Sequence, residues 1–281
     1  MSLPPTELPK PWRPKFFRDY GWADEPRLED RWTEVQGRPL FSRSSRRPGT
    51  TPFVLVHGLI ISSLAMIPLA EVLAEEHEVH ALDLPGFGRS QGPSHALSMP
   101  ELAGAMVDWM SAAGLERCHL VGHSLGCQIA AHVGANSPER LASLTLIAPT
   151  IDADAHDIVL QALRLLADLP HESLGLWPDM LVDIIRAGPR RIVETIRLMF
   201  ADFIERQLPR ITTPTLIITA GGDPISVATW AERIARSLPD PELCTLPGTR
   251  HCVHYSQPEQ VAERLAAFLR HLEDRRTPAS F

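Results

Sequence analysis

Short apolar runs alternate with amphipathic stretches along most of the chain. Six short, mostly apolar runs of four or five residues predict strands, and the run at 53–56 has the continuity of a strand that is buried on both faces of a sheet. They cover residues 53–56, 79–82, 118–121, 144–148, 215–219 and 242–246. Between them, apolar residues recur at helical spacing over 64–73, 99–113, 125–135 and 227–237, and in a last stretch from Pro258. This alternation predicts an α/β domain of three layers with a mostly parallel sheet.

Two segments depart from this alternation. Ahead of it, residues 32–35 and 39–41 flank a Gln-Gly turn, which predicts a hairpin. Within it, residues 149–209 contain no strand pattern and therefore predict an all-helical insertion. The helical patterns of this insertion cover 156–169, 178–187 and 189–207.

The same reading divides the chain into three parts. We expect an N-terminal arm over 1–31, a core formed by 32–148 and 210–281, and the insertion over 149–209. The arm has too many prolines for a helix or a central strand. Its aromatic side chains are expected to pack on the core, with a dimer interface or a pocket mouth as the alternative.

Capping residues mark the start of the last helix. Ser256 and Glu259 have the spacing of a capping box, in which each side chain bonds the other residue's backbone N–H group. The sequence therefore predicts that Ser256 caps this helix.

Charge and composition narrow the class of protein. The 27 basic and 34 acidic side chains give a net charge of −7, which argues against a nucleic-acid partner. No stretch approaches ~18 consecutive apolar residues, so we expect no membrane insertion. The first residues lack the features of a signal peptide, and we expect a cytoplasmic protein. The four cysteines show no metal-binding spacing and are expected to be reduced thiols.

The strongest chemical signal is Gly122-His123-Ser124-Leu125-Gly126, a G-x-S-x-G pattern. It follows a predicted strand and opens a predicted helix. A serine at such a tight turn needs glycine on both sides, because a β-carbon two residues away would collide with the turn. The context therefore indicates that Ser124 is a nucleophile.

A serine hydroxyl is a weak nucleophile, so it needs a base, and the base needs a carboxylate to orient it. His251 follows the strand predicted over 242–246, and Asp223 follows the one over 215–219. The carboxyl ends of parallel strands lie at one edge of a sheet, so the three side chains are expected to meet there.

Other residues compete for these roles. His254 is an alternative base, and Asp152 or Asp154 is an alternative acid. His57 and His123 are expected to pack and form hydrogen bonds near the serine. Cys252, next to His251, is expected to be a packed thiol.

The chain resembles the α/β-hydrolase fold superfamily from about residue 32 to residue 270. The matching segments are His-Gly-Leu at 57–59, Asp-Leu-Pro-Gly-Phe-Gly-Arg-Ser at 83–90, the motif at 122–126, Gly-Asp-Pro at 222–224, and Arg-His at 250–251 followed by Gln-Pro-Glu at 257–259. The resemblance implies a three-layer α/β-hydrolase fold in which the helical insertion is the family's cap. It also implies that Ser124 is the nucleophile, Asp223 the acid and His251 the base, with the backbone N–H groups of Leu59 and Leu125 as the oxyanion hole.

The chain departs from the family pattern at two places. Arg250 replaces the glycine that usually precedes the catalytic histidine, and Leu59, Ile60 and Ile61 stand where many relatives have small residues. The bulk of these three side chains is expected to narrow the acyl pocket. Family members that dehalogenate or open epoxides have aspartate at the nucleophile position, so Ser124 excludes them.

We therefore expect a serine hydrolase that cleaves an ester or thioester of a hydrophobic small molecule through an acyl-enzyme on Ser124. Three alternatives stay open: a carbon–carbon bond hydrolase of a diketone or dienone, a cofactor-free acyltransferase or synthase, and a non-catalytic ligand receptor. Relatives of the first kind usually have Asn where this chain has His123. No phosphate-binding loop or dinucleotide fingerprint is present, so no cofactor is implied, and no metal site is expected. A homodimer is compatible with the sequence.

Overall fold

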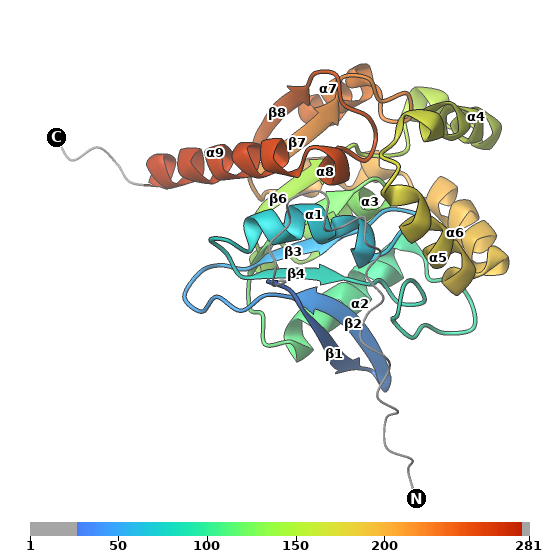
Figure 1. The fold of residues 1–281 in the computed structure, drawn as a ribbon. Coiled ribbons are helices and arrows are strands. Elements are labelled where there is room, and N and C mark those ends of the chain that lie inside the picture. The colour runs from blue at the N-terminus through green and yellow to red at the C-terminus, as the bar shows by residue number, and fades with distance from the viewer. Residues whose placement is uncertain (1–26, 277–281) are drawn as a thin grey trace, which may run out of the picture.

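A twisted sheet of eight strands forms the centre of the molecule (Figure 1). The computed structural model describes residues 27–276, so most of the predicted arm lies outside the described residues. The strand order is β1-β2-β4-β3-β5-β6-β7-β8; β2 is antiparallel to both of its neighbours, and all other neighbours are parallel. The strands are β1 (Glu29–Val35), β2 (Arg38–Ser44), β3 (Phe53–Val56), β4 (Val79–Leu82), β5 (Cys118–His123), β6 (Leu141–Ile147), β7 (Thr215–Ala220) and β8 (Pro241–Leu246). The predicted hairpin and mostly parallel sheet are confirmed.

Helices cover both faces of the sheet. The helices of the core are α1 (Ser63–Leu73), α2 (Met99–Ala112), α3 (Leu125–Asn136), α7 (Ala228–Ser237), α8 (Val253–Ser256) and α9 (Pro258–Arg276). Side chains of β3 alternate between the two faces: Val54 and Val56 pack with residues of α2, α3 and α7, whereas Phe53 and Leu55 pack with residues of α1 and α9. The continuous apolar strands thus fill two cores, which gives the three layers that the sequence predicts.

Three further helices follow β6, before the chain returns to the sheet at β7. They are α4 (Ile158–Asp168), α5 (Leu176–Ala187) and α6 (Pro189–Ala201), and they lie together at one side of the molecule (Figure 1). This is the α/β-hydrolase fold with inserted helices. The exact limits of the predicted arm, core and cap stay predictions.

Many apolar side chains of these inserted helices do not pack on the core. Leu163, Leu166 and Leu174, for example, are 58%, 61% and 75% exposed. On α4 only Asp168 is buried. One face of α4 lines a cavity, and the other is exposed to solvent.

Two local predictions are wrong. The predicted helix over 189–207 ends at Ala201, because the Asp202 carboxylate is held by Nε2 of His132 at 2.7 Å and by Nε2 of Gln128 at 3.1 Å. Ser256 does not cap α9; it belongs to α8, and its hydroxyl donates to the carbonyl oxygen of Cys252.

Within residues 27–276, no helix has both the length and the apolar character needed to cross a membrane.

Candidate active site

Ser124 occupies the turn between β5 and α3. Its backbone angles are φ = 54° and ψ = −117°, a strained conformation for a residue with a side chain. A β-carbon on Gly122 would lie 2.5 Å from the carbonyl oxygen of Gly126, and one on Gly126 would lie 2.4 Å from that of Val56. The two glycines of the motif are therefore required by the close approach of backbone on both sides of the serine.

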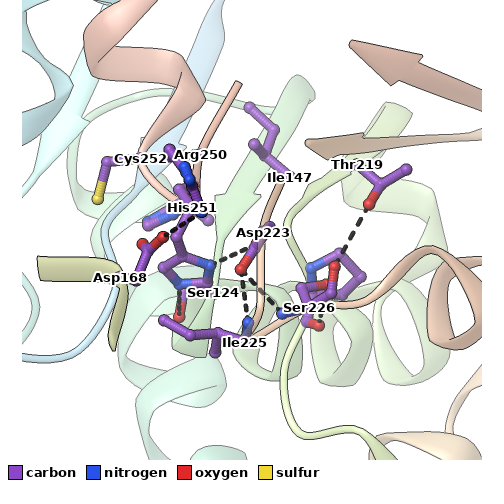
Figure 2. A network of polar contacts seen from close by, with 12 residues as sticks. Ser124, Ile147, Asp168, Thr219, Asp223, Ile225, Ser226, Arg250, His251 and Cys252 are labelled. Atoms are coloured by element: carbon purple, nitrogen blue, oxygen red, sulfur yellow. Dashed lines mark hydrogen bonds and ion pairs between the residues drawn. The ribbon is translucent and has the colours of Figure 1, made fainter. Parts of the chain in front are cut away.

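The structure brings Ser124, His251 and Asp223 together at the carboxyl ends of β5, β8 and β7 (Figure 2). Nε2 of His251 is 3.0 Å from Oγ of Ser124, and Nδ1 of His251 is 2.7 Å from Oδ2 of Asp223. The other oxygen of Asp223 accepts the backbone N–H groups of Ile225 at 2.7 Å and Ser226 at 3.1 Å. The carboxylate is thus fixed in place, and it orients the imidazole toward the serine.

Charges around this array favour a basic imidazole. Burial raises the pKa of the Asp223 carboxyl, but His251 and the backbone donors outweigh burial, so that the pKa lies below its ordinary value. Burial lowers the pKa of His251, but the carboxylates of Asp223, Glu172 and Asp168 outweigh it and hold the pKa above its ordinary value. A more basic imidazole accepts the serine proton more readily.

His254, the alternative base, is not hydrogen-bonded to Ser124, His251 or Asp223. His254 is buried on α8, and its ring is 4.0 Å from the ring of His123, centroid to centroid. Burial, together with the charge of His251, lowers the pKa of His254 to about 3. Neither ring nitrogen has a hydrogen-bond partner among the described residues. His254 therefore packs as a neutral ring and does not reach the serine.

The rival acids point elsewhere. Asp152 accepts the backbone N–H of Asp154 at 3.0 Å and pairs with Arg164 at 3.3 Å. Asp154 is exposed and pairs with Arg233 at 2.5 Å. Neither contacts the histidine.

The other histidines near the serine are hydrogen-bonded, as predicted. Nε2 of His123 donates to the carbonyl oxygen of His251 at 3.1 Å. His57 donates through Nδ1 to the carbonyl oxygen of Gly58 and accepts the backbone N–H of Leu84 at Nε2. His123 in particular ties the serine turn to the backbone of the histidine loop.

Arg250 strengthens the loop in which it replaces a glycine. Its guanidinium donates to the carbonyl oxygen of Gly222 at 2.8 Å. Gly222 precedes Asp223, and Arg250 precedes His251. The departure from the family pattern therefore links the two loops that carry the acid and the histidine.

A mostly apolar cavity of about 180 Å³ opens at Ser124 and His251. The inserted helices and the segment after β3 supply most of its wall. Its apolar lining includes Ile60, Ile61, Leu165, Met180, Met199 and Phe200. The bulky segment 59–61 does line the space in front of the serine.

The two residues expected to supply the oxyanion donors are near Ser124 in the structure or in the chain. Leu59 lines the cavity, and a β-carbon on the preceding Gly58 would be 3.1 Å from Cβ of Ser124. Leu125 is the first residue of α3, where backbone N–H groups have no acceptor within the helix. The arrangement can activate a serine, and the oxyanion hole stays a prediction.

Residues 53–264 match the alpha/beta hydrolase family. The chain belongs to this family. The dihydrolipoyllysine-residue acetyltransferase component of the acetoin cleaving system of Pseudomonas putida is 30% identical to the hydrolase over 257 residues, which are 84% of this chain and 68% of that protein.

Solved structures support the fold of the hydrolase. A bacterial membrane phospholipase A superposes with a TM-score of 0.78 at 23% identity, over 88% of this chain and 87% of its own. An esterase from Thermogutta terrifontis superposes with a TM-score of 0.72 at 22% identity, over 86% and 98%. At these identities the likeness concerns the fold alone.

The sequence did not single out two cavity residues of the hydrolase, Asp168 and Glu172. Carboxylates in an amphipathic helical run usually face solvent. The signal that was available is spacing: Asp168 lies three residues after Leu165, on the same helix face, and both line the cavity.

The structure also bears on the cysteines of the hydrolase and on possible metal ligands. The four cysteines are free, and burial holds the pKa of the Cys252 thiol well above its ordinary value, as expected for a packed thiol. Across residues 27–276, no group of three or more His, Cys, Asp or Glu side chains is arranged to hold a metal ion.

Proposed function

We propose that the hydrolase cleaves an ester or thioester of a hydrophobic small molecule through an acyl-enzyme on Ser124. The observation that carries this proposal is the hydrogen-bonded series from Asp223 through His251 to Ser124, which opens into a mostly apolar cavity. An apolar cavity favours a substrate with hydrocarbon next to its reactive carbonyl.

The proposed reaction begins at the serine. Nε2 of His251 accepts the proton of the Ser124 hydroxyl while Oγ attacks the carbonyl carbon. The negative oxygen that forms faces the N–H groups of Leu59 and Leu125, and one such donor typically stabilises the transition state by about 3–4 kcal/mol. The bond to the alcohol or thiol breaks, and the histidine returns its proton to that leaving group.

Water completes the cycle. His251 takes a proton from a water molecule that attacks the acyl carbon, and the acid leaves as the proton returns to Ser124. Asp223 stays ionised throughout and stabilises the imidazolium, in keeping with its lowered pKa.

Replacement of the nucleophile tests this proposal. Ser124→Ala is expected to fold normally, to lose covalent labelling by a fluorophosphonate, and to hydrolyse 4-nitrophenyl esters at least ~10³-fold more slowly than the wild type. Intact mass spectrometry measures the labelling, and a series of acyl chain lengths measures the preference. Undiminished turnover by pure Ser124→Ala would rule out an acyl-enzyme on this serine. A preference for acetyl esters would count against a hydrophobic substrate.

Acyl transfer is the second candidate function. It is favoured by the Pseudomonas putida relative, whose name describes an acetyltransferase component. The chemistry is the same up to the acyl-enzyme, after which an alcohol, amine or thiol replaces water. Product analysis with and without an added acceptor distinguishes the two, because a transferase forms the acylated acceptor in preference to the free acid.

A further inference from the structure

Two carboxylates from the inserted segment line the otherwise apolar cavity. Asp168 ends α4, and Glu172 follows it by one helical turn. They are 1% and 9% exposed, and both face the space that Ser124 and His251 also line. Buried acidic groups in an apolar wall are costly unless a partner compensates for their charge.

The partners of the two carboxylates differ. Oδ1 of Asp168 lies 3.8 Å from the guanidinium of Arg250 (Figure 2). Oε1 of Glu172 accepts the backbone N–H of Cys252 at 2.8 Å. Among the described residues, no cationic side chain lies within ion-pairing distance of Glu172, and its Oε2 is buried without a donor. Of the two carboxylates, only Asp168 therefore has an ion-pair partner among the described residues.

Burial favours the neutral form of Glu172. It raises the pKa of Glu172 to about 7, and the neighbouring Asp168 carboxylate raises it further against the opposing Cys252 N–H group and the charge of His251. Two adjacent carboxylates can avoid repulsion by sharing one proton. A ligand that brings its own positive charge and several donors would replace that proton.

We propose that Asp168 and Glu172 bind a protonated amine of the substrate, so that the preferred ester or thioester carries an ammonium group attached to an apolar acyl chain. This inference rests on the proposed function. An ammonium offers three N–H donors and one positive charge, which match Oε2 of Glu172 and the carboxylate beside it. A neutral hydroxyl offers one donor and leaves the charge uncompensated.

The amine site has a defined pH dependence. Glu172 must be ionised to pair with an ammonium, and its pKa is about 7. The preference for an ammonium substrate should therefore increase as pH rises from 6 to 8, where an alkylamine remains protonated. The other titratable groups around Glu172 are His251, whose charge opposes protonation of Glu172 and whose pKa lies above its ordinary value, and His254, which is neutral throughout this range. His251 acts on both esters of a matched pair, so the ratio of their rates isolates the ionisation of Glu172.

Matched esters test the proposal. We would compare 4-nitrophenyl 6-aminohexanoate with 4-nitrophenyl heptanoate, and shorter and longer pairs, as the ratio of their kcat/KM values at pH 8. The wild type is expected to prefer the ammonium ester by at least ~10-fold at one chain length. Glu172→Gln keeps an acceptor for Cys252 but loses the charge, and this ratio should fall toward one. Asp168→Asn should lower the ratio as well.

The control is Glu139→Gln, which removes one charge from an exposed residue outside the cavity and should leave the ratio unchanged. Thermal melting confirms that each variant is folded. An unchanged ratio in Glu172→Gln, or a wild type that hydrolyses both esters without preference at any length, would overturn the amine site. A fall in both rates with the ratio preserved would also overturn it, since Glu172 would then act only on the histidine loop, through the Cys252 backbone and the pKa of His251.

A binding measurement separates this inference from the proposed function. Calorimetry with Ser124→Ala should detect hexylammonium more strongly than 1-hexanol, and Glu172→Gln in that background should abolish the difference. If wild type is not labelled by fluorophosphonate but hexylammonium still binds through Glu172, the hydrolase proposal fails and the amine site stands. Equal binding of the amine and the alcohol overturns the amine site, whatever the catalytic result.

Discussion

Gly126 is as important for the serine turn as the serine itself. A β-carbon at this position would lie 2.4 Å from the carbonyl oxygen of Val56, a distance that backbone atoms cannot accept. Gly126→Ala is therefore expected to lower the free energy of unfolding by about 1–3 kcal/mol and to weaken fluorophosphonate labelling. Urea unfolding measures the change.

Gly104 provides a matched control. It lies in α2, and a β-carbon there would have no atom within 4 Å. Gly104→Ala should raise the free energy of unfolding by up to about 1 kcal/mol, because alanine favours helices. Equal effects at the two glycines would show that the close contact at Gly126 is not what requires glycine there.

The two histidines of the last loop can be separated by substitution. His251→Ala is expected to lower kcat/KM by at least ~10³-fold, because the serine loses its base. His254→Phe should stay within about 10-fold of the wild type and melt at a similar temperature, since a neutral ring packs in its place. Ester hydrolysis and thermal melting check both results, and the reverse order of the two activities would restore His254 as the base.

At the scale of residues, the role of a side chain can be predicted from the sequence when the residues next to it in the chain form a recognisable pattern. Ser124 is recognised by its glycines, and Asp223 and His251 by their places after strands. Asp168 and Glu172 are not recognisable in this way. Their meaning depends on which face of α4 turns toward the cavity, and that is decided by packing between distant segments.

On the scale of elements, α5 presses two more acidic side chains against the core. Asp179 and Asp183 are 7% and 2% exposed. Burial raises the pKa of Asp179 to about 6 and that of Asp183 to about 7; near Asp183, Ser62 opposes the effect and Asp83 adds to it. The contact between α5 and the core is thus made with carboxyl groups that remain partly protonated near neutral pH.

Asp183 should make stability depend on pH. Its folded pKa of about 7 exceeds that of an unfolded aspartate, so its contribution is most favourable below pH 4 and is lost as pH rises to about 7. Asp183→Asn removes this loss and should raise the free energy of unfolding by about 1–3 kcal/mol at pH 8, where a pKa difference of one is worth about 1.4 kcal/mol. The gain should shrink at pH 5.

Urea unfolding at pH 5 and pH 8 measures the difference, with exposed Glu139→Gln as the control. A gain that is equal at both pH values would mean that the substitution acts through packing and not through ionisation.

Elements were predictable where a local pattern determines them. The runs at 53–56 and 79–82 match β3 and β4 residue for residue, because a short, mostly apolar run is typical of a strand that is buried on both faces. The end of α6 was missed because the partners of Asp202 lie on α3, some 70 residues earlier.

The capping box predicted at the start of α9 is instead found at the start of α2. There the Glu101 carboxylate accepts both the N–H and the hydroxyl of Ser98.

For the whole molecule, the parallel topology explains why the site could be placed before the structure was known. Strands β5, β7 and β8 share one direction, so the residues after them meet at one edge. The position of the inserted helices over that edge could not be predicted, because their apolar residues face both the cavity and solvent.

The site is shared between two halves of the chain. Ser124 precedes the insertion, and Asp223 and His251 follow it, while pairing of β6 with β7 joins the halves. Fragments 1–174 and 175–281, divided at the exposed Leu174, are expected to be unlabelled by fluorophosphonate when separate and labelled when expressed together. Labelling of the first fragment alone would show that Ser124 reacts without His251.

This division also sets the time at which activity arises during synthesis. The serine turn can form once β5, β6 and α3 have been made, but the histidine belongs to almost the last tenth of the chain. Chains are synthesised at about 5–20 residues per second, so His251 is made several seconds after Ser124. For several seconds the newborn polypeptide thus holds a nucleophile without its base, and it becomes reactive only when β8 has joined the sheet and the cavity above it is closed.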